Sequence, residues 1–265
     1  VVAFNNEVLI AEWLCSCLWA RNYQLIYRSV TAPSGIVFHS GGGFISSSRF
    51  RIISMAVSKA NLVISQCEMM EQDVRKSFGI PAEKSQYIYN PIDAAENIVL
   101  PIETAGSPYF LIIGRLDFNK DQATAIQAFS VLKKRGYEDI RLVIAGDGPT
   151  RDELERLTQN LGVSDYVDFL GYVSDVDSLY LSAHAVLLTS HYEGFPNVLV
   201  EAIGFGVPIL SFDILSVPSE IIIDGVNGLL VKNRNSIFIY LFTPMNQSKQ
   251  LKKSFRSIER CYLPL

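Results

Sequence analysis

The stretch AVLLTSHYEGFPNVLVEA, residues 185–202, contains an apolar run, a polar loop and the beginning of a helix, in that order. The apolar run at 185–188 predicts a buried strand, and residues 198–203 form a helical pattern. In an open α/β sheet, ligands bind where the strands end and the loops begin. We therefore expect the stretch at 191–202 to carry the functional site, with the rest of the chain as its scaffold.

This loop combines residues suited to an anionic ligand. Gly194 allows close approach of a ligand to the backbone, and Pro196 suits a first helical turn, whose N–H groups would face an anion. On one helix, Glu193 and Glu201 would stand about 12 Å apart. A glycosidase needs its two carboxylates about 5 to 9.5 Å apart, so the spacing disfavours a glycoside hydrolase.

Strand and helix patterns alternate on both sides of this stretch. Strands are predicted at 109–113, 141–145, 167–170, 185–188 and 208–212, and helices at 122–135, 151–161, 176–182 and 198–205. This alternation predicts a parallel sheet with helices on both faces.

The first 93 residues show the same alternation less clearly. Helices are predicted at 8–20, 49–59 and 68–78, strands at 24–30 and 61–65, and a glycine-rich loop at 40–48. We divide the chain into a partial N-terminal domain (1–93), a linker (94–108), a second domain (109–231) and a basic tail (232–265).

The composition indicates an ordered globular protein, with 49% hydrophobic and 19% charged residues. A net charge of −4 gives no general attraction to nucleic acid. The tail holds seven Lys or Arg and one acid, which favours a solvated helix face and leaves a peripheral contact with an anionic membrane open. The four cysteines form no disulfide or zinc pattern, and residues 8–20 are too short to span a bilayer, so a cytoplasmic location is expected.

Two cations follow the first strand of the second domain. Arg115 and Lys120 lie at a predicted carboxyl end, where Arg as a fork and Lys as a point charge suit a pyrophosphate. Surface charge is the alternative, and the nearby Glu193 loop favours phosphate.

Three other motifs have plain structural interpretations. The turn at 146–149 lacks the third glycine of a dinucleotide fingerprint, so it predicts a tight turn or a ligand-facing loop, not an NAD site. Gly171 and Tyr172 suit a simple turn or an edge beside a flat base. Asp175 and Asp177 have metal-binding spacing, but helix capping is the favoured interpretation and no metal is expected.

Five motifs in order resemble the carboxyl-terminal domain of the retaining family 4 ("group 1") glycosyltransferases of GT-B fold. They are IGRL at 113–116 with Lys120, AGDGP at 145–149, FLG at 169–171, EGFPN at 193–197 with Glu201, and GVNGLLV at 225–231. The resemblance implies two Rossmann-like parallel-sheet domains, of which the N-terminal one here matches only the second half of the family's acceptor domain.

The resemblance also implies roles for individual residues. Arg115 and Lys120 would hold the donor diphosphate, Glu201 the ribose hydroxyls, and Glu193 the sugar near the reacting centre. The loop that would cradle the sugar and the phosphate consists of Gly194, Phe195, Pro196, Asn197 and Val198. Gly171 and Tyr172 would border the base. His39 or Arg28 would face the donor sugar, with His39 ranked first.

The expected activity is transfer of a hexosyl unit from a UDP-sugar or GDP-sugar to a glycan or lipid-linked acceptor, with retention and without a required cofactor or metal. Polysaccharide biosynthesis is the expected process. The alternative is a nucleotide-sugar-binding fragment without catalytic activity, because the family's first strands and their glycine-rich loop have no counterpart in this sequence.

Overall fold

A computed structural model describes residues 1–18, 23–30, 32–33, 44–91, 108–137, 139–214, 217–234, 237 and 241 of the chain. These residues form two compact units. The first contains Val1–Pro91 together with Tyr192–Pro196, and the second contains Ile92–His191 and Asn197–Leu265. His39, most of the expected linker and most of the basic tail lie outside the described residues.

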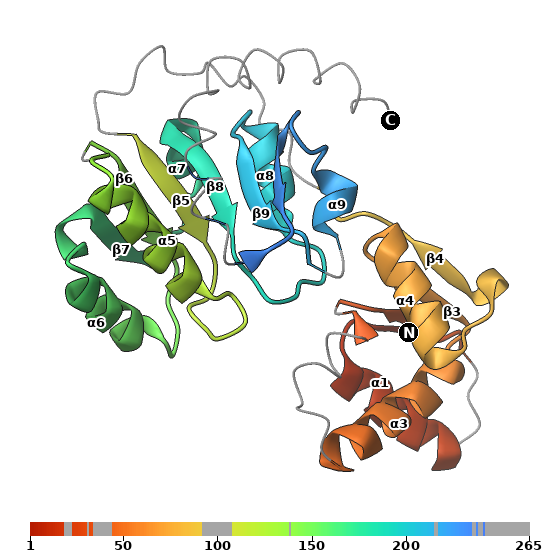
Figure 1. The fold of residues 1–265 in the computed structure, drawn as a ribbon. Helices are drawn as coiled ribbons and strands as arrows, with labels where there is room; N and C mark the ends of the chain where they lie inside the picture. Colours follow the sequence, from red (N-terminus) through yellow and green to blue (C-terminus); the bar gives the residue numbers. More distant parts are fainter. Residues whose placement is uncertain are drawn as a thin grey trace. The chain divides into compact units, whose positions relative to one another are not determined.

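The second unit is built on a six-stranded parallel sheet in the order β10-β9-β8-β5-β6-β7 (Figure 1). The strands are β5 (Tyr109–Ile113), β6 (Arg141–Ala145), β7 (Val167–Gly171), β8 (Ala183–Leu188), β9 (Ile209–Phe212) and β10 (Gly228–Val231). The helices are α5 (Gln122–Lys134), α6 (Arg151–Leu161), η2 (Ser164–Tyr166), α7 (Asp177–Ser182), α8 (Asn197–Gly204) and α9 (Pro218–Ile221). The predicted parallel sheet is confirmed.

Alternating side chains of the strands feed two cores, one on each face of this sheet. Phe110 and Ile112 of β5 pack in the core that α5 and α6 cover, whereas Leu111 between them packs in the core that α7 and α8 cover. All three are at most 5% exposed. Because successive strand residues point to opposite faces, an uninterrupted apolar strand is what a sheet covered on both sides requires.

The strand order places a topological switch point between β5 and β8. From β5 the chain proceeds outward through β6 and β7, and then returns to β8 on the other side of β5. In open α/β sheets, ligands bind at the carboxyl ends of the strands beside such a switch point. Arg115 and Lys120 follow β5, and residues 189–191 follow β8, so these two segments of the second unit flank this point.

The first unit contains a four-stranded parallel sheet in the order β1-β2-β3-β4. Its strands are β1 (Val2–Ala3), β2 (Ile26–Arg28), β3 (Leu62–Ser65) and β4 (Ser85–Tyr87), and its helices are α1 (Asn6–Leu18), α3 (Phe44–Ser58), α4 (Glu68–Phe78) and η1 (Ala82–Lys84). Gly79 ends α4 with a left-handed φ of 66°, as the sequence predicted.

The loop predicted at 40–48 is wrong for residues 44–48, which belong to a helix. The helix α3 begins at Phe44, five residues before the predicted start at Arg49. The sequence signal was weak because Ser46, Ser47 and Ser48 have only moderate helix propensity and also suit turns and caps. The glycines at 41–43 lie outside the described residues.

Candidate functional site

The loop after β5 carries the two predicted phosphate-binding cations. The Arg115 side chain is 71% exposed, and its Nε lies 3.7 Å from Oδ2 of Asp117. The Lys120 side chain runs back over the end of β5, since a Cβ built on Gly114 would lie 3.7 Å from its Cε. Both cations therefore stand at the carboxyl edge of the sheet, beside the switch point.

Hydrogen bonds of three side chains hold this loop in place. The buried amide of Gln122 donates from Nε2 to the carbonyl of Arg115 at 2.9 Å. The Lys120 amide donates to the Asp117 carboxylate at 3.1 Å. Asp121 then caps α5 by accepting from the amide and hydroxyl of Thr124. A cation on such a loop is held ready for its ligand, which lowers the entropy lost on binding.

The end of β8 is tied to the same loop. Thr189 Oγ1 donates to the carbonyl of Lys120 at 2.9 Å, and the amide of His191 donates to the carbonyl of Asn119 at 2.7 Å. Thr189 is 1% exposed. The two loops that flank the switch point therefore form one hydrogen-bonded layer within the second unit.

Arg234 adds a partly buried cation to this layer. Its guanidinium donates to Oδ2 of Asp121 at 2.6 Å and to the carbonyls of Thr189 and Ser190, at 3.1 and 2.5 Å. It also lies over the ring of Phe212, 4.2 Å from the centroid. One side chain from beyond the last strand thus joins the loops after β5 and β8.

His191 borders the same carboxylate. Its Nε2 lies 3.6 Å from Oδ2 of Asp121, and its ring stacks on Phe118 with centroids 5.1 Å apart. Burial and the positive charge of Arg234 lower the pKa of His191, and the Asp121 carboxylate opposes them. The imidazole is therefore held mainly neutral near pH 7.

Glu201 lies one turn into α8 and is held by a buried tyrosine. The hydroxyl of Tyr180 donates to Oε2 of Glu201 at 2.6 Å. Helix α8 begins at Asn197, and amides in its first turn, such as that of Val198, have no acceptor within the helix. The second unit thus presents a carboxylate and a helix start beside the loops described above.

The central part of the predicted loop, Tyr192–Pro196, groups by its contacts with the first unit. Glu193 is 8% exposed. The ring of Phe195 lies 6.0 Å from that of Tyr89, and a Cβ on Gly194 would stand 2.2 Å from the carbonyl oxygen of Val30. Position 194 admits only glycine because the backbone of Val30 lies so close, and the predicted close approach of a ligand to Gly194 stays a prediction.

The turn at 146–149 is shaped by packing against the Arg115 loop. A Cβ on Gly146 would lie 1.9 Å from the carbonyl oxygen of Gly114, and one on Gly148 would lie 2.2 Å from that of Leu116. The amide of Leu116 donates to the carbonyl of Asp147 at 2.9 Å. The tight-turn interpretation therefore has a physical basis, because the turn packs against the loop that carries Arg115.

The predicted base-side edge lies at the end of β7. Gly171 has a left-handed φ of 68° and pairs with Gly146 by accepting its amide at 2.7 Å. Tyr172 follows and is 85% exposed. An exposed aromatic ring at a strand end offers a flat surface to a planar ligand.

Asp175 and Asp177 are arranged as a turn before α7. Oδ1 of Asp175 accepts from the amide of Asp177 at 3.2 Å, as in an Asx turn. The N-cap residue of α7 is Val176, which makes no side-chain capping hydrogen bond, so the N-cap predicted at an aspartate is wrong. In the described part of the chain, no group of three or more His, Cys, Asp or Glu side chains could hold a metal ion.

Of the two candidates for the sugar-facing position, only Arg28 is described. It ends β2, and its guanidinium donates to Oδ1 of Asn90 at 2.7 Å. Gln66 donates to the same oxygen at 3.1 Å. Arg28 is thus tied to the Asn90-Pro91 turn, and the choice between Arg28 and His39 stays a prediction.

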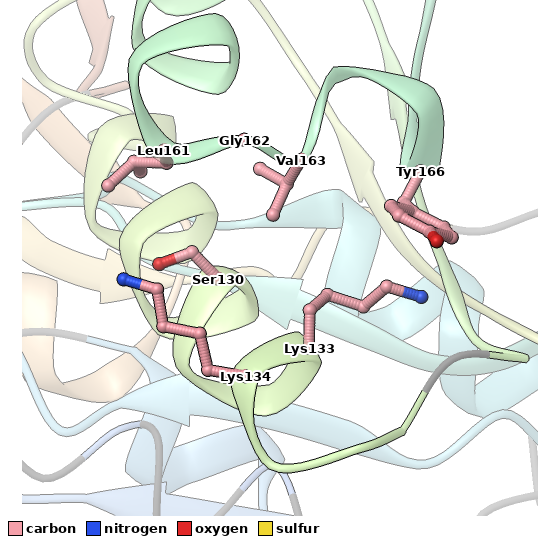
Figure 2. Close-up of a pocket in the computed structure, with 7 residues that line it drawn as sticks. All are labelled: Ser130, Lys133, Lys134, Leu161, Gly162, Val163 and Tyr166. Atoms are coloured by element: carbon pink, nitrogen blue, oxygen red, sulfur yellow. The ribbon is translucent and has the colours of Figure 1, made fainter.

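A pocket of about 230 Å³ lies in the second unit between the C-terminal ends of α5 and α6, on the side where the strands begin (Figure 2). It is lined by the ends of α5 and α6 and by η2, through Ser130, Lys133, Lys134, Leu161, Gly162, Val163 and Tyr166. Lys133 Nζ lies 3.4 Å from the centroid of Tyr166 and donates to the carbonyl of Ile140. Its charge is thus used within the fold, and the pocket is remote from the strand ends that carry the candidate site.

The structure brings Arg115 and Lys120 to one edge with the start of α8, as the sequence implied. The sequence analysis missed three contributors: Tyr180 lies within a predicted helix, Arg234 within the predicted basic tail, and Asp121 was given no role. Their roles depend on contacts between distant segments, which no local spacing encodes.

This geometry defines a two-unit α/β protein with a candidate ligand site at the carboxyl ends of a parallel sheet. Residues 101–238 match the model of the glycosyl transferases group 1 family. The chain belongs to this family.

The chain is 30% identical, over 265 residues, to the Campylobacter jejuni N-acetylgalactosamine-N,N'-diacetylbacillosaminyl-diphospho-undecaprenol 4-alpha-N-acetylgalactosaminyltransferase, spanning 97% of this chain and 69% of that protein. It is 35% identical, over 156 residues, to the Salmonella typhimurium lipopolysaccharide 1,6-galactosyltransferase, spanning 57% of this chain and 43% of that protein.

HepE of Anabaena, solved with UDP-glucose, has a similar fold, with a TM-score of 0.80 and 21% identity over 96% of this chain and 71% of that one. The GT-B type of fold predicted from the sequence is confirmed. No helix among the described residues is long and apolar enough to cross a membrane.

Proposed function

We propose that this protein transfers a hexosyl unit from a nucleotide-diphospho-sugar to a glycan or lipid-linked acceptor, with retention of configuration. The observation that carries the proposal is the edge at the β5/β8 switch point, where Arg115 and Lys120 stand beside the start of α8. Two cations and a helix start suit a diphosphate, because they oppose the charge that develops on the leaving group.

Individual roles follow from this assignment. Arg115 and Lys120 bind the diphosphate of a UDP-sugar or GDP-sugar, and Glu201 accepts from the ribose hydroxyls. Glu193 contacts the donor sugar near its reacting carbon, with the amides of Gly194 to Val198 around the sugar and phosphate. Gly171 and Tyr172 border the base. No metal or cofactor is required, since these cations and the helix start supply the positive charge.

The acceptor is proposed from relatives whose names specify a diphospho-undecaprenol-linked glycan and a lipopolysaccharide. An acceptor of this kind stands at a membrane surface, so we place the protein in the cytoplasm with peripheral contact at the inner face. Basic residues of the tail, such as Lys232, suit anionic lipid headgroups.

The donor is tested by thermal stabilisation with a panel of UDP-sugars and GDP-sugars. A donor at about 100 times its dissociation constant stabilises the protein by roughly 2.7 kcal/mol. The stabilisation should be lost in Arg115→Ala and Lys120→Ala and kept in Lys134→Ala, which removes an exposed cation at the pocket between α5 and α6. If no donor raises the melting temperature, the proposed donor site is wrong.

Transfer is tested with the stabilising donor and an undecaprenyl-diphosphate-linked glycan, with the anomeric configuration of the product read by NMR. An inverted product would exclude retention. Donor binding without turnover would favour the alternative, a nucleotide-sugar-binding protein without catalytic activity.

A further inference from the structure

Tyr180 and Glu201 form a pair across two helices of the second unit. Tyr180 lies on α7 and is fully buried, and its hydroxyl is 2.6 Å from Oε2 of Glu201 on α8. Both helices cover the same face of the sheet, with Tyr180 in the core that contains Leu111. The carboxylate of Glu201 is therefore anchored from inside the protein.

The tyrosine ring is itself held in place. It stacks on Phe205 with centroids 5.1 Å apart and an interplanar angle of 11°. Burial, followed by the hydrogen bond and charge of Glu201, raises the pKa of Tyr180 well above its ordinary value. The hydroxyl thus stays protonated and acts as a fixed donor.

This arrangement engages one side of the carboxylate only. Among the residues that the structure describes, Tyr180 is the one hydrogen-bond partner of the Glu201 side chain, and Glu201 itself is only half-buried. An ionised carboxylate has about four acceptor positions, so Oε1 and part of Oε2 are available to other donors. A vicinal diol supplies two donors at the spacing of two carboxylate oxygens.

Fixing the carboxylate affects binding as well as structure. A glutamate side chain at a surface loses rotamer freedom when it binds a ligand, and holding it beforehand removes part of that cost. We propose that Tyr180 is a positioning residue for nucleotide recognition, which orients Glu201 to accept from both ribose hydroxyls. This inference rests on the proposed function, because it assumes a ribonucleotide donor.

The test compares nucleotides that differ only in the diol. UDP and GDP, each beside its 2′,3′-dideoxy counterpart, are titrated calorimetrically into wild type, Tyr180→Phe and Phe205→Leu. Tyr180→Phe removes one oxygen and keeps the ring in its stack. It should weaken binding of the ribonucleotide about tenfold and leave the dideoxynucleotide unchanged, as for loss of one hydrogen bond to a charged group.

Phe205→Leu is the matched control, since it removes the stacked ring and keeps the hydroxyl. It should lower stability while preserving the preference for ribose. The preference is a ratio of two affinities measured on the same sample, so a partly unfolded variant changes the apparent stoichiometry and not the ratio. Steady-state kinetics give a second readout: Tyr180→Phe should raise the donor KM with little change in kcat.

The outcomes separate this inference from the proposed function. If wild type prefers the ribonucleotide and Tyr180→Phe keeps that preference, the positioning role is wrong while the donor site stands. Equal weakening of both nucleotides by Tyr180→Phe would show a purely structural role. If wild type binds neither nucleotide, the proposed function fails and the inference fails with it.

Discussion

The guanidinium of Arg234 lies 2.6 Å from Oδ2 of Asp121, joining the segment after β10 to the N-terminus of α5. The same guanidinium donates to the carbonyls of Thr189 and Ser190. Asp121 directly follows Lys120, and Ser190 precedes the Glu193 loop. Within the second unit, the pair therefore joins the segment that carries Lys120 to the end of β8.

Replacing Arg234 tests how much this link contributes. Arg234→Met keeps an apolar stem but removes the guanidinium that lies over Phe212 and donates to Asp121 and to two carbonyls. Because the side chain is 31% exposed, we expect a loss of about 1–2 kcal/mol in the free energy of unfolding, measured by urea denaturation. The donor KM should also rise, because Lys120 is less well held.

Arg234→Lys is the control for this prediction. It keeps the charge but cannot donate in a fork to Asp121 and the carbonyls together, so it should recover only part of the loss. Full recovery would mean that charge alone matters, and an unchanged donor KM in both variants would remove the link to the site.

The backbone of Asp121 supports a second prediction. Its φ of 47° and ψ of 47° place it in the left-handed region, which residues other than glycine, asparagine and aspartate rarely adopt. Asp121→Ala should cost about 2–4 kcal/mol, since it adds left-handed strain to the loss of the helix cap and of the Arg234 partner.

Asp121→Asn should cost about 1 kcal/mol, because asparagine tolerates this backbone conformation and caps helices. Chemical denaturation of the two variants gives the comparison. Equal destabilisation by both substitutions would show that the charge of Asp121 outweighs its conformation.

Local patterns were sufficient to predict most of the second unit. Strands β5 and β6 and helix α6 begin and end where apolar runs and helical spacing predicted them. Continuous apolar strands between amphipathic helices leave few alternatives to a parallel sheet, so the strand ends, and with them Arg115 and Lys120, could be placed at one edge.

The contacts that organise the site could not be predicted in the same way. Tyr180 and Glu201 are 21 residues apart, and Arg234 and Asp121 are 113 apart. Each pair depends on how helices and loops pack after the sheet has formed. Arg234 falls in the tail whose excess of Lys and Arg predicts a solvated helix face, and only the fold shows its guanidinium 4.2 Å from the centroid of the Phe212 ring.

The environment of His191 gives the protein a predictable response to pH. Burial and Arg234 lower its pKa below the ordinary value of 6.5. Between that lowered pKa and 6.5 the unfolded chain binds more protons than the folded one, so the free energy of unfolding rises with pH across this window. The contribution of the neutral His191 to the free energy of unfolding is complete above pH 6.5. It is lost as the pH falls through the pKa that His191 has in the folded protein.

His191→Gln should flatten this part of the stability curve, measured by urea denaturation from pH 7.5 to 5. The chain has three histidines, so the titration of His191 can be assigned by NMR from the signal that the variant lacks. Asp121→Asn removes the one charge that raises the pKa, and it should shift the titration to lower pH. A shift to higher pH would contradict the electrostatic assignment.

Packing of the turn at 146–149 leads to a steric prediction. A methyl group at position 148 would lie 2.2 Å from the carbonyl oxygen of Leu116, next to Arg115, so Gly148→Ala must displace one of the two loops. We expect it to cost about 3 kcal/mol and to weaken donor binding.

Gly206→Ala is the matched control. Its φ of 66° is strained for alanine, but no atom lies within 4 Å of the added Cβ. It should therefore cost about 1 kcal/mol and leave donor affinity unchanged. Similar effects of the two substitutions on donor affinity would show that the turn at 146–149 does not support the Arg115 loop.

The two glutamates of the opening motif should separate kinetically. Glu193, 8% exposed, is proposed to act at the reacting carbon, whereas Glu201 on α8 is proposed to hold the ribose. Glu193→Gln keeps the shape of the side chain and removes its charge, so kcat should fall on the order of 10²–10³-fold with little change in donor affinity. Glu201→Gln should raise the donor KM and leave kcat nearly unchanged, because ribose contacts are equally present in the ground state and the transition state.

Melting temperatures of both variants should stay near that of wild type, which excludes unfolding as the cause. Turnover that survives Glu193→Gln would remove the proposed catalytic role, and a fall in kcat with Glu201→Gln would place that carboxylate at the reacting centre instead.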